Sequence, residues 1–402
     1  MNDFRIPRSK NSRLGVYHYI VSGASWGEDG ILFRRNRLTE YLLHHEKTAG
    51  VYYIYPSGIR IKHPIKDFKS LNQRTGFLPN NVFQIALPDN RGWMRYGNIL
   101  GRYIQKRLLK YIHKDALSFL WFTNPSYAGL ADLPVWDKVI YDCSDYWNRP
   151  PSRPNKIKSE KKIISRSNYI FATSQFLVDY IETVSKKSAI LIENGVDFNM
   201  FTTAEPCELT ELPSPRLGFV GGMKSKIDYG LLLFLAKRDV GINIVLIGPI
   251  VDKNNEKLSE LLRLPNVYSI GPVESKVVPS YMKTLDVGLL PYKKIDYNLA
   301  VSPLKLFEYL SVGLPCVGTG VPSTKKYMND GIYYFTESGY EEFYLLCKKA
   351  YKRKNDDLNK KRRIELAREN DWSQKFSAML DVVQLDYNPD KHKQERELKT
   401  SR

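Results

Sequence analysis

Short apolar runs alternate with amphipathic segments along most of the chain. The runs are rich in Val, Ile, Tyr and Phe, which is typical of strands buried on both faces in a parallel sheet covered by helices. In the first half the predicted strands span residues 15–21, 51–55, 82–86, 117–122, 138–142, 169–173 and 189–193. This pattern predicts a parallel, doubly wound α/β sheet.

A second series of strands follows a break in periodicity. Residues 199–215 are rich in Pro, Thr and Glu and are interpreted as a linker. Beyond it, the predicted strands span residues 216–222, 243–248, 266–271, 286–291 and 315–319. The expected organisation is two Rossmann-like domains, a final helix and a charged tail, over residues 1–198, 216–372, 373–386 and 387–402. Ligands of open α/β sheets bind at the carboxyl ends of the strands, here in a cleft between the domains.

The segment Ser302–Thr319, SPLKLFEYLSVGLPCVGT, resembles a helix that begins beside a ligand. Ser302 is predicted to cap the first turn, and Pro303 suits the first helical position. Lys305 then stands where the helix dipole favours anions, and Glu308 follows it in the less favourable order. An anionic ligand between the helix N-terminus and the lysine would account for these charges. A lysine that extends into solvent would account for them as well.

A glycine pair ends the first strand of the second domain. Gly221 and Gly222 would let the backbone approach a phosphate closely, and Lys224 and Lys226 would balance its charge. Glycines after a strand are also ordinary turn formers. Together with the capped helix and its lysine, however, they suit a diphosphate. Glu308, one turn deeper, could accept hydrogen bonds from the paired hydroxyls of a ribose.

Five segments follow one another as they do in the group 1 family of GT-B glycosyltransferases. They are NGVD, FVGG, LIGP, IGPVESKVVPSYMKTLDVGLLPY and SPLKLFEYLSVGLPCVGT, between residues 190 and 320. The chain is similar to bacterial enzymes that build surface polysaccharides, including teichuronic acid biosynthesis glycosyltransferases and the xanthan glucuronosyltransferase. The resemblance implies two facing Rossmann-like domains, a nucleotide-sugar donor in the C-terminal domain and an acceptor in the N-terminal one. It also implies a last helix that crosses back to the N-terminal domain.

The resemblance implies which residues bind the donor. Backbone groups of the turn 269–275 could meet the base, although an ordinary β–α turn would look the same. The candidate donor-binding residues are Gly221, Gly222, Lys224, Lys226, Val273, Tyr292, Ser302, Pro303, Leu304, Lys305 and Glu308. One position departs from the family pattern. Retaining members usually have a Glu eight residues before the glutamate that matches Glu308, and here that position is Ala300, so a retaining mechanism is less strongly indicated.

Two carboxylates near the end of a first-domain strand are candidates for the general base that an inverting transfer needs. Asp142 ends the strand and Asp145 follows it. Either could take the proton from an acceptor hydroxyl, and we favour Asp145 because Asp142 is closer to the strand and could pin the loop. A capping aspartate is the alternative interpretation.

Other residues of the first domain have structural interpretations. His18, within the first strand, is expected in the core or in support of a loop. Arg34, Arg35 and Arg37 are expected to form a solvated helix face. The glycines of residues 22–30 do not form GxGxxG, so a dinucleotide site is not indicated, although this loop could shape an acceptor site.

The net charge of +18 requires an anionic partner or location, unless it serves only solubility. Residues 91–114 alternate aromatic with basic side chains, and Arg102, Lys106, Lys110 and Lys114 recur every four residues. This basic stripe predicts an amphipathic helix at an anionic membrane surface. Its apolar face could instead pack in the core. Nucleic acid is the least favoured partner, because the sequence has no RNP, helix-turn-helix or zinc motif.

Several absences complete the prediction. The sequence has no Asp-x-Asp pair, so we expect no metal and no cofactor besides the donor substrate. Four scattered cysteines indicate a reducing compartment. The sequence contains no run of about 18 apolar residues, so we expect no membrane span. We expect a cytoplasmic, peripherally membrane-bound glycosyltransferase that moves a sugar from a nucleotide sugar, with UDP favoured, to a lipid-linked saccharide in cell-envelope or exopolysaccharide biosynthesis. The alternative is a UDP-sugar epimerase or hydrolase of the same fold.

Overall fold

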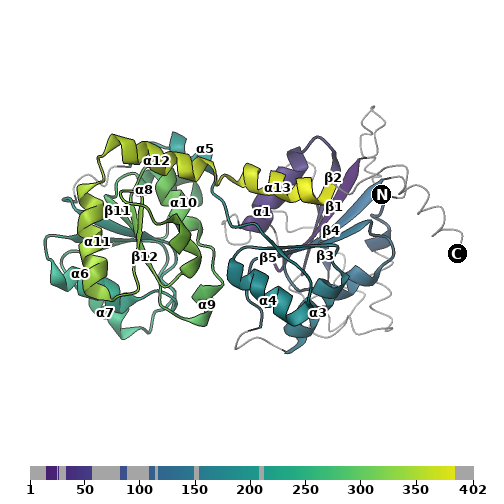
Figure 1. Ribbon diagram of the computed structural model, residues 1–402, viewed down its shortest axis with the longest axis horizontal. Coiled ribbons are helices and arrows are strands. Elements are labelled where there is room, and N and C mark those ends of the chain that lie inside the picture. Colours follow the sequence, from purple (N-terminus) through teal and green to yellow (C-terminus); the bar gives the residue numbers. More distant parts are fainter. Residues whose placement is uncertain are drawn as a thin grey trace, which may run out of the picture.

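The computed structural model has two α/β domains that lie side by side along the long axis of the molecule (Figure 1). The structure describes residues 15–24, 26, 33–56, 82–87, 108–113, 116–148, 154–207 and 212–384. Only the last part of the predicted basic stripe, residues 108–113, falls within these ranges. Arg102, Lys106 and Lys114 lie outside them.

The first domain is built on a parallel sheet of seven strands in the order β3-β2-β1-β4-β5-β6-β7. The strands are β1 Val16–Val21, β2 Thr48–Pro56, β3 Val82–Leu87, β4 Leu117–Phe122, β5 Lys138–Cys143, β6 Tyr169–Ala172 and β7 Ile190–Leu191. Along β1, Tyr19 and Val21 point into one core and Val16 and Ile20 into the other. Both faces of the strand are therefore buried, which explains its continuous apolar run.

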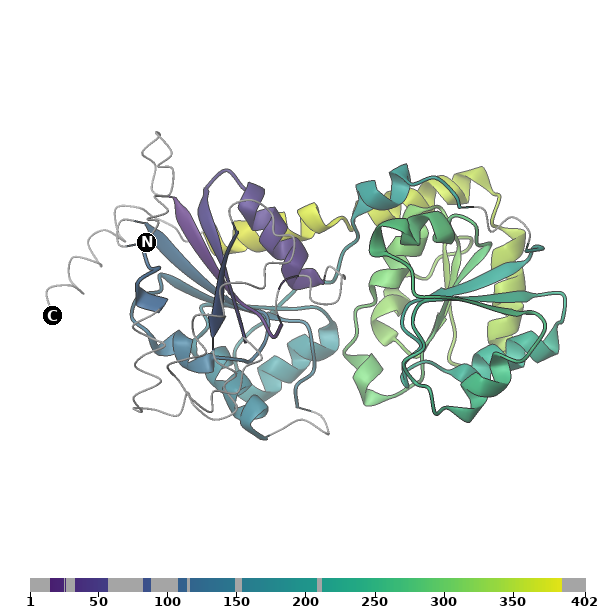
Figure 2. The ribbon, with the colours of Figure 1, turned by 180° about the vertical axis from the view of Figure 1, so that it is seen from behind.

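Helices cover both faces of this sheet, as the views from the front and from behind show (Figures 1 and 2). One face carries α1 Arg34–His44 together with the last helix of the chain, α13 Trp372–Gln384. The other face carries η2 Ala128–Asp132, α3 Pro154–Arg166 and α4 Gln175–Ser185. The predicted doubly wound arrangement is confirmed.

The second domain repeats the plan with six parallel strands in the order β10-β9-β8-β11-β12-β13. They are β8 Arg216–Val220, β9 Asn243–Ile247, β10 Val267–Gly271, β11 Val287–Pro291, β12 Cys316–Thr319 and β13 Tyr333–Phe335. The helical elements are α5 Phe198–Thr203, α6 Tyr229–Arg238, α7 Glu256–Leu261, η3 Ser275–Val277, α8 Val278–Met282, α9 Asp296–Leu299, α10 Leu304–Ser311, η4 Pro322–Tyr327, α11 Tyr340–Lys352 and α12 Asp357–Arg368. Strand β13 was not predicted from the sequence, because it has only three residues.

The chain crosses between the domains twice, and the two crossings are bonded to each other. Val196 N–H donates to the carbonyl oxygen of Asn370 at 3.0 Å, and Trp372 N–H donates to that of Val196 at 3.0 Å. The second crossing leads into α13, whose apolar side chains belong to the core of the first domain. Since each fully buried Phe, Met or Leu side chain contributes about 1.5–3 kcal/mol, α13 is an integral part of that domain.

Candidate functional site

The carboxyl ends of β8 and β9 approach each other closely in the second domain. Gly221 N–H donates to the carbonyl oxygen of Ile247 at 2.8 Å. A Cβ atom at Gly248, where φ is +136°, would lie 2.3 Å from the carbonyl oxygen of Gly221. Only glycine fits at Gly248, because both the contact and the backbone conformation exclude a side chain. The glycines at this strand end give the backbone no side chains that would block a ligand, as a phosphate-binding turn requires.

Helix α10 starts beside this turn. If Gly221 had a Cβ atom, it would lie 3.9 Å from Cε of Lys305, so the lysine in the first turn of α10 packs against the glycine pair. Lys305 Nζ also forms an ion pair with Glu308 Oε2 at 2.5 Å. Lys224 lies on the other side, with its Cε 3.3 Å from the position of a Cβ at Gly222. The structure therefore brings together the glycine pair, two lysines and Glu308.

The start of α10 differs from the sequence prediction. The helix begins at Leu304 with Pro303 as its N-cap, and no side chain caps its first turn within the described part of the chain. The predictions that Ser302 is the cap and that Pro303 takes the first helical position are wrong. The hydroxyl oxygen of Ser302 instead accepts a hydrogen bond from the backbone N–H of Asn194 in the first domain at 3.1 Å. The amides of the first helical turn are left without a side-chain partner, which suits an anion.

Of the remaining donor candidates, Lys226 and Tyr292 lie close together, whereas Leu304 packs against the core of the first domain. Lys226 Nζ is 5.1 Å from the ring centre of Tyr297 and 5.5 Å from that of Tyr292. Tyr292 itself is buried at the end of β11, and burial raises the pKa of its hydroxyl. Val273, in the turn after β10, is half-buried against the domain core. The side chain of Tyr292 therefore supports the site from within the core.

Ala300 lies at the junction of the two domains. Its side chain is 4% exposed and packs in the core cluster of the first domain, although it belongs to the second. The position at which the family pattern has a carboxylate is therefore filled by an apolar contact between domains. A charged group buried here would need a partner.

Asp142 and Arg34 form a buried ion pair between β5 and α1. Arg34 Nε donates to the two carboxylate oxygens at 3.1 and 2.8 Å, and the side chains of Arg34 and Asp142 are 6% and 1% exposed. Arg34 Nη1 also donates to the carbonyl oxygen of Glu193 at 3.0 Å. Asp142 thus fixes α1 to the sheet, and this occupation disfavours it as the general base.

The other two arginines of α1 are also engaged. Arg37 Nη2 lies 3.0 Å from Asp197 Oδ2, and Arg35 Nε donates to the hydroxyl of Tyr53 at 3.2 Å. The prediction of a solvated helix face is therefore wrong, most clearly for the buried Arg34. A signal was present in the sequence, because Arg34 lies one turn before Leu38 on the apolar stripe of the helix.

Asp145 lies half-exposed in the loop after β5. Side chains of α3 and α4 hold the end of β5 and this loop in place. The Glu160 carboxylate, on α3, accepts hydrogen bonds from the hydroxyls of Tyr141 at 2.8 Å and Tyr180 at 2.9 Å. Burial raises the pKa of this carboxyl group. The ring of Tyr146 packs edge-on against Tyr180, with centroids 5.0 Å apart. Asp145 therefore combines access to solvent with a firmly held loop.

His18 is a core residue, as predicted. It is 2% exposed, and its Nδ1 atom lies 3.0 Å from Nε1 of Trp121, which donates to it. Burial, assisted by the charge of His45, lowers the pKa of His18 to about 3. The imidazole is therefore neutral at ordinary pH and carries no charge into the site.

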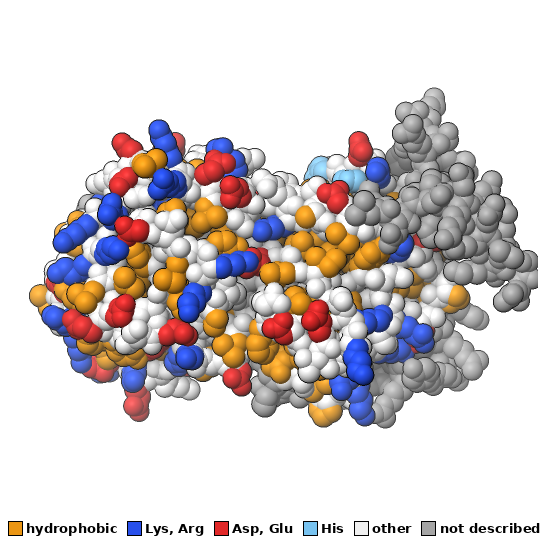
Figure 3. Space-filling model, viewed as in Figure 1, with side chains coloured by type: hydrophobic (Ala, Val, Ile, Leu, Met, Phe, Trp, Pro, Cys, Tyr) orange, Lys and Arg blue, Asp and Glu red, His pale blue; other side chains and the backbone are white. Residues whose placement is uncertain are grey.

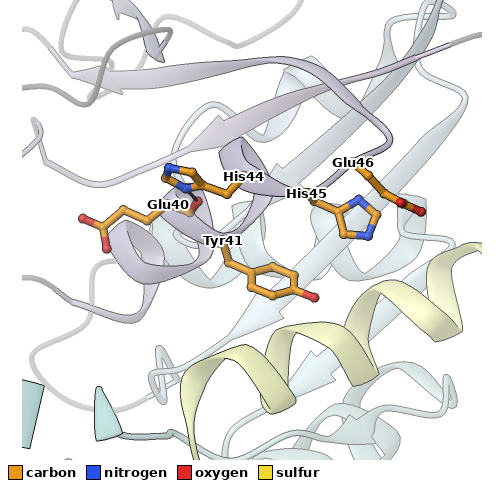
Figure 4. Close-up of a pocket in the computed structure, with 5 residues that line it drawn as sticks. All are labelled: Glu40, Tyr41, His44, His45 and Glu46. Carbon is orange, nitrogen blue, oxygen red and sulfur yellow. Dashed lines mark hydrogen bonds between the residues drawn. The ribbon is translucent and has the colours of Figure 1, made fainter. Parts of the chain in front are cut away.

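A surface hollow lies elsewhere, at the end of α1. Figure 4 shows its lining residues Glu40, Tyr41, His44, His45 and Glu46, with the Tyr41 ring directed toward α13. This end of α1 leads into the amino end of β2, so the hollow is at the sheet edge opposite to the ligand-binding end. Within the described ranges, no three His, Cys, Asp or Glu side chains are placed to hold a metal ion.

Basic side chains do not gather in one patch on the face shown in Figure 3 but spread over both domains. The high net charge is therefore not explained by a single described surface on that face. Among the described residues, no helix has both the length and the apolar character needed to cross a membrane.

Comparisons with known proteins agree with this fold. Residues 214–349 match the family described as glycosyl transferases group 1. Over 394 residues, 91% of this chain and 96% of the relative, the chain is 33% identical to a protein named putative teichuronic acid biosynthesis glycosyltransferase TuaH from Bacillus subtilis strain 168.

Two solved structures illustrate the shared fold. The Anabaena protein Alr3699/HepE, in complex with UDP, superimposes with a TM-score of 0.66 at 12% identity, over 92% of this chain and 99% of that one. WaaG, a glycosyltransferase involved in lipopolysaccharide biosynthesis, has a TM-score of 0.60 at 12% identity and the same coverage. The chain is a glycosyltransferase with the GT-B fold and belongs to the group 1 family.

Proposed function

We propose that this enzyme transfers a sugar from a nucleotide sugar, most simply a UDP-sugar, to a lipid-linked saccharide during the synthesis of a cell-envelope or extracellular polysaccharide. The observation that carries the donor side is the packing of Lys305, in the uncapped first turn of α10, against Gly221 at the end of β8. The polysaccharide context is supported by the teichuronic acid relative, and the nucleotide by the UDP bound to the Anabaena protein.

The donor site has the chemistry to stabilise a departing diphosphate without a metal. The amides of the α10 start and of Gly222 would donate hydrogen bonds to phosphate oxygens, while Lys305 and Lys224 supply positive charge. Glu308, now paired with Lys305, would accept from the ribose hydroxyls. In this assignment Lys305 exchanges part of its contact with Glu308 for the phosphate.

On the acceptor side, Asp145 would take the proton from the attacking hydroxyl in an inverting transfer. Two observations support this choice over Asp142. Asp145 is half-exposed on an anchored loop, whereas Asp142 is buried in its ion pair with Arg34. The apolar Ala300 at the domain junction also favours a mechanism that does not rely on a carboxylate at that position.

A lipid-linked acceptor makes attachment to an anionic membrane surface useful. The predicted basic stripe carries this part of the proposal, and Lys110 within it is exposed. Each Lys or Arg near an anionic bilayer contributes about 1 kcal/mol, so reversing several charges should release the protein. Replacement of Arg102, Lys106 and Lys110 by Glu should therefore abolish co-sedimentation with anionic vesicles. Unchanged co-sedimentation would assign the stripe to a merely solvated surface.

The reaction itself is tested by following labelled sugar. A panel of nucleotide sugars is first screened by thermal shift, and each stabilising one is then supplied in labelled form with a bacterial lipid extract. The proposal predicts that label moves into the lipid fraction and that free nucleotide diphosphate appears in equal amount. Label that stays in free sugar or in a rearranged nucleotide sugar would instead indicate a hydrolase or an epimerase.

A further inference from the structure

The two domains are held together by hydrogen bonds beside the points where the chain crosses between them. We propose that Asn194 is a positioning residue for sugar transfer. It holds the start of α10 at a fixed distance from the first-domain loop that carries Asp145. The inference rests on the proposed function, in which α10 faces the donor diphosphate and Asp145 faces the acceptor.

Asn194 binds Ser302, at the entry to α10, through both its backbone and its side chain. The backbone N–H of Asn194 donates to the hydroxyl oxygen of Ser302 at 3.1 Å, and Nδ2 donates to the carbonyl oxygen of Ser302 at 2.7 Å. Ser302 is buried, and α10 begins at Leu304. Because a buried carbonyl that loses its donor is costly, this contact fixes the direction in which the chain enters the helix.

The preceding residue binds a second element of the same domain. The Glu193 carboxylate accepts a hydrogen bond from the hydroxyl of Tyr327 at 2.6 Å and pairs with Lys326 Nζ at 2.5 Å. Both partners belong to η4, and Ser323 of η4 donates to the carbonyl oxygen of Val301 at 2.6 Å. Residues 193 and 194 thus hold η4 and the α10 entry as one unit.

The chain crossings alone do not set the angle between the domains. The two crossings are joined through Val196 and Asn370, and they lie side by side in both ribbon views (Figures 1 and 2). A Cβ atom at Gly195 would lie 2.7 Å from the carbonyl oxygen of Asn370, so the pair of crossings is tightly packed. Two adjacent crossings act as a single hinge. Contacts to one side of it, such as that of Asn194, then decide how far it opens.

The same segment is bonded to the acceptor side. Arg34 Nη1 donates to the carbonyl oxygen of Glu193 at 3.0 Å, while its Nε donates to Asp142 at the end of β5. A continuous set of bonds therefore runs from the entry of α10 through residues 193 and 194 to the strand that precedes Asp145. Reacting groups must come within about 3–3.5 Å, and a misplacement of about 1 Å costs on the order of 100-fold in rate.

The test uses Asn194→Ala in the full chain, with Arg37→Ala as the matched control. Arg37 forms another ion pair at the junction, with Asp197, and its other described side-chain bond goes to Glu40 of α1. Asn194→Ala is expected to lower kcat by about 10- to 100-fold while the Kd for UDP and the donor KM change less than about twofold, since the donor groups all lie in the second domain. Arg37→Ala should keep kcat within about twofold of wild type.

A double variant separates this contact from a general loss of structure. Ser302→Ala removes the hydroxyl that accepts from Asn194. It leaves the bond from Asn194 Nδ2 to the Ser302 carbonyl oxygen in place, whereas Asn194→Ala removes that bond and keeps the backbone N–H. Because the two bonds hold the same junction, the loss of kcat in Asn194→Ala/Ser302→Ala should be smaller than the product of the two separate losses. Asn194→Ala/Arg37→Ala should show the product of the separate effects.

Domain geometry provides a readout that does not depend on activity. Cys207 is the half-buried cysteine among four, so nitroxides at Glu182→Cys and Ser259→Cys in a Cys207→Ser background report the distance between the domains. A narrow distance distribution is expected for wild type and Arg37→Ala, and a broader or shifted one for Asn194→Ala. This result would support the hinge role of Asn194 even if wild type transferred no sugar, which would refute the proposed function instead.

Two results would overturn the inference. An unchanged distance distribution in Asn194→Ala would show that Asn194 does not set the domain angle. A weaker UDP affinity with an unchanged kcat would place Asn194 in donor binding.

Discussion

Replacement of Asp142 by Asn distinguishes the structural role of Asp142, in β5, from the catalytic role proposed for Asp145, in the loop that follows. The substitution keeps the size of the side chain but leaves the Arg34 guanidinium, 6% exposed, without its carboxylate. Removal of one partner of a buried ion pair costs about 3–5 kcal/mol. Against a total of about 5–15 kcal/mol for a typical protein, this is a large loss. For a domain of this size it should lower the thermal midpoint by at least about 6 °C.

Asp145→Asn is the matched comparison, because it makes the same chemical change in the half-exposed loop. Its unfolding free energy should fall by less than about 1 kcal/mol. Its kcat should fall by about 100- to 10,000-fold with unchanged UDP affinity, since an amide cannot accept the proton. The double variant Arg34→Met/Asp142→Leu should recover part of the stability lost in Asp142→Asn, because no unpaired charge remains.

Urea unfolding followed by tryptophan fluorescence and steady-state kinetics below the unfolding range measure both quantities. An unfolding free energy of Asp142→Asn within about 1 kcal/mol of wild type would refute the structural role of the ion pair. A folded Asp142→Asn that loses turnover, beside an active Asp145→Asn, would exchange the two roles. Normal turnover in both would remove the first-domain base and favour a retaining mechanism.

Three further predictions concern the donor turn, a buried arginine and the buried histidine. Gly248→Ala should weaken UDP binding at least about tenfold by displacing Gly221, whereas Gly339→Ala, also at positive φ but with no atom within 4 Å, should cost only about 1–3 kcal/mol of stability; calorimetry and urea unfolding measure these effects. Arg363, fully buried, donates to three backbone carbonyl oxygens, so Arg363→Met should cost at least about 3 kcal/mol in urea unfolding. Since burial lowers the pKa of His18 to about 3, the unfolded chain takes up a proton that the folded one does not. Stability should therefore fall by up to about 1.4 kcal/mol per pH unit as the pH drops from about 6 to 4, and His18→Asn should flatten this slope.

The sequence predicted the fold well because strands buried on both faces leave an unmistakable pattern. Each of the predicted apolar runs overlaps a strand, in two parallel sheets. The exception is Tyr333–Phe335, where three residues are too few for any period to show. The order of the strands was not evident from their pattern, since many orders bury the same faces.

The site was predictable where local chemistry decides it and was missed where a distant residue does. Gly221 and Lys305 could be placed together because the carboxyl ends of parallel strands meet at one edge. Ser302 was misassigned as a cap because its partner, Asn194, is 108 residues away. Arg34 was assigned to solvent although its place on the apolar stripe of α1 indicated burial, and nothing near it in the sequence identifies its partner Asp142, also 108 residues away.

The central claim is that the start of α10 holds the diphosphate of a nucleotide-sugar donor. The most direct measurement is calorimetric titration of wild type and Lys305→Ala with UDP and with uridine. The account predicts that Lys305→Ala weakens UDP binding by at least about tenfold and uridine binding by less than about twofold. The reason is that Lys305, in this assignment, contacts the phosphates of the ligand and not its nucleoside part. Equal loss of UDP and uridine affinity, or a wild-type enzyme that binds neither UDP nor any other nucleoside diphosphate, would contradict it.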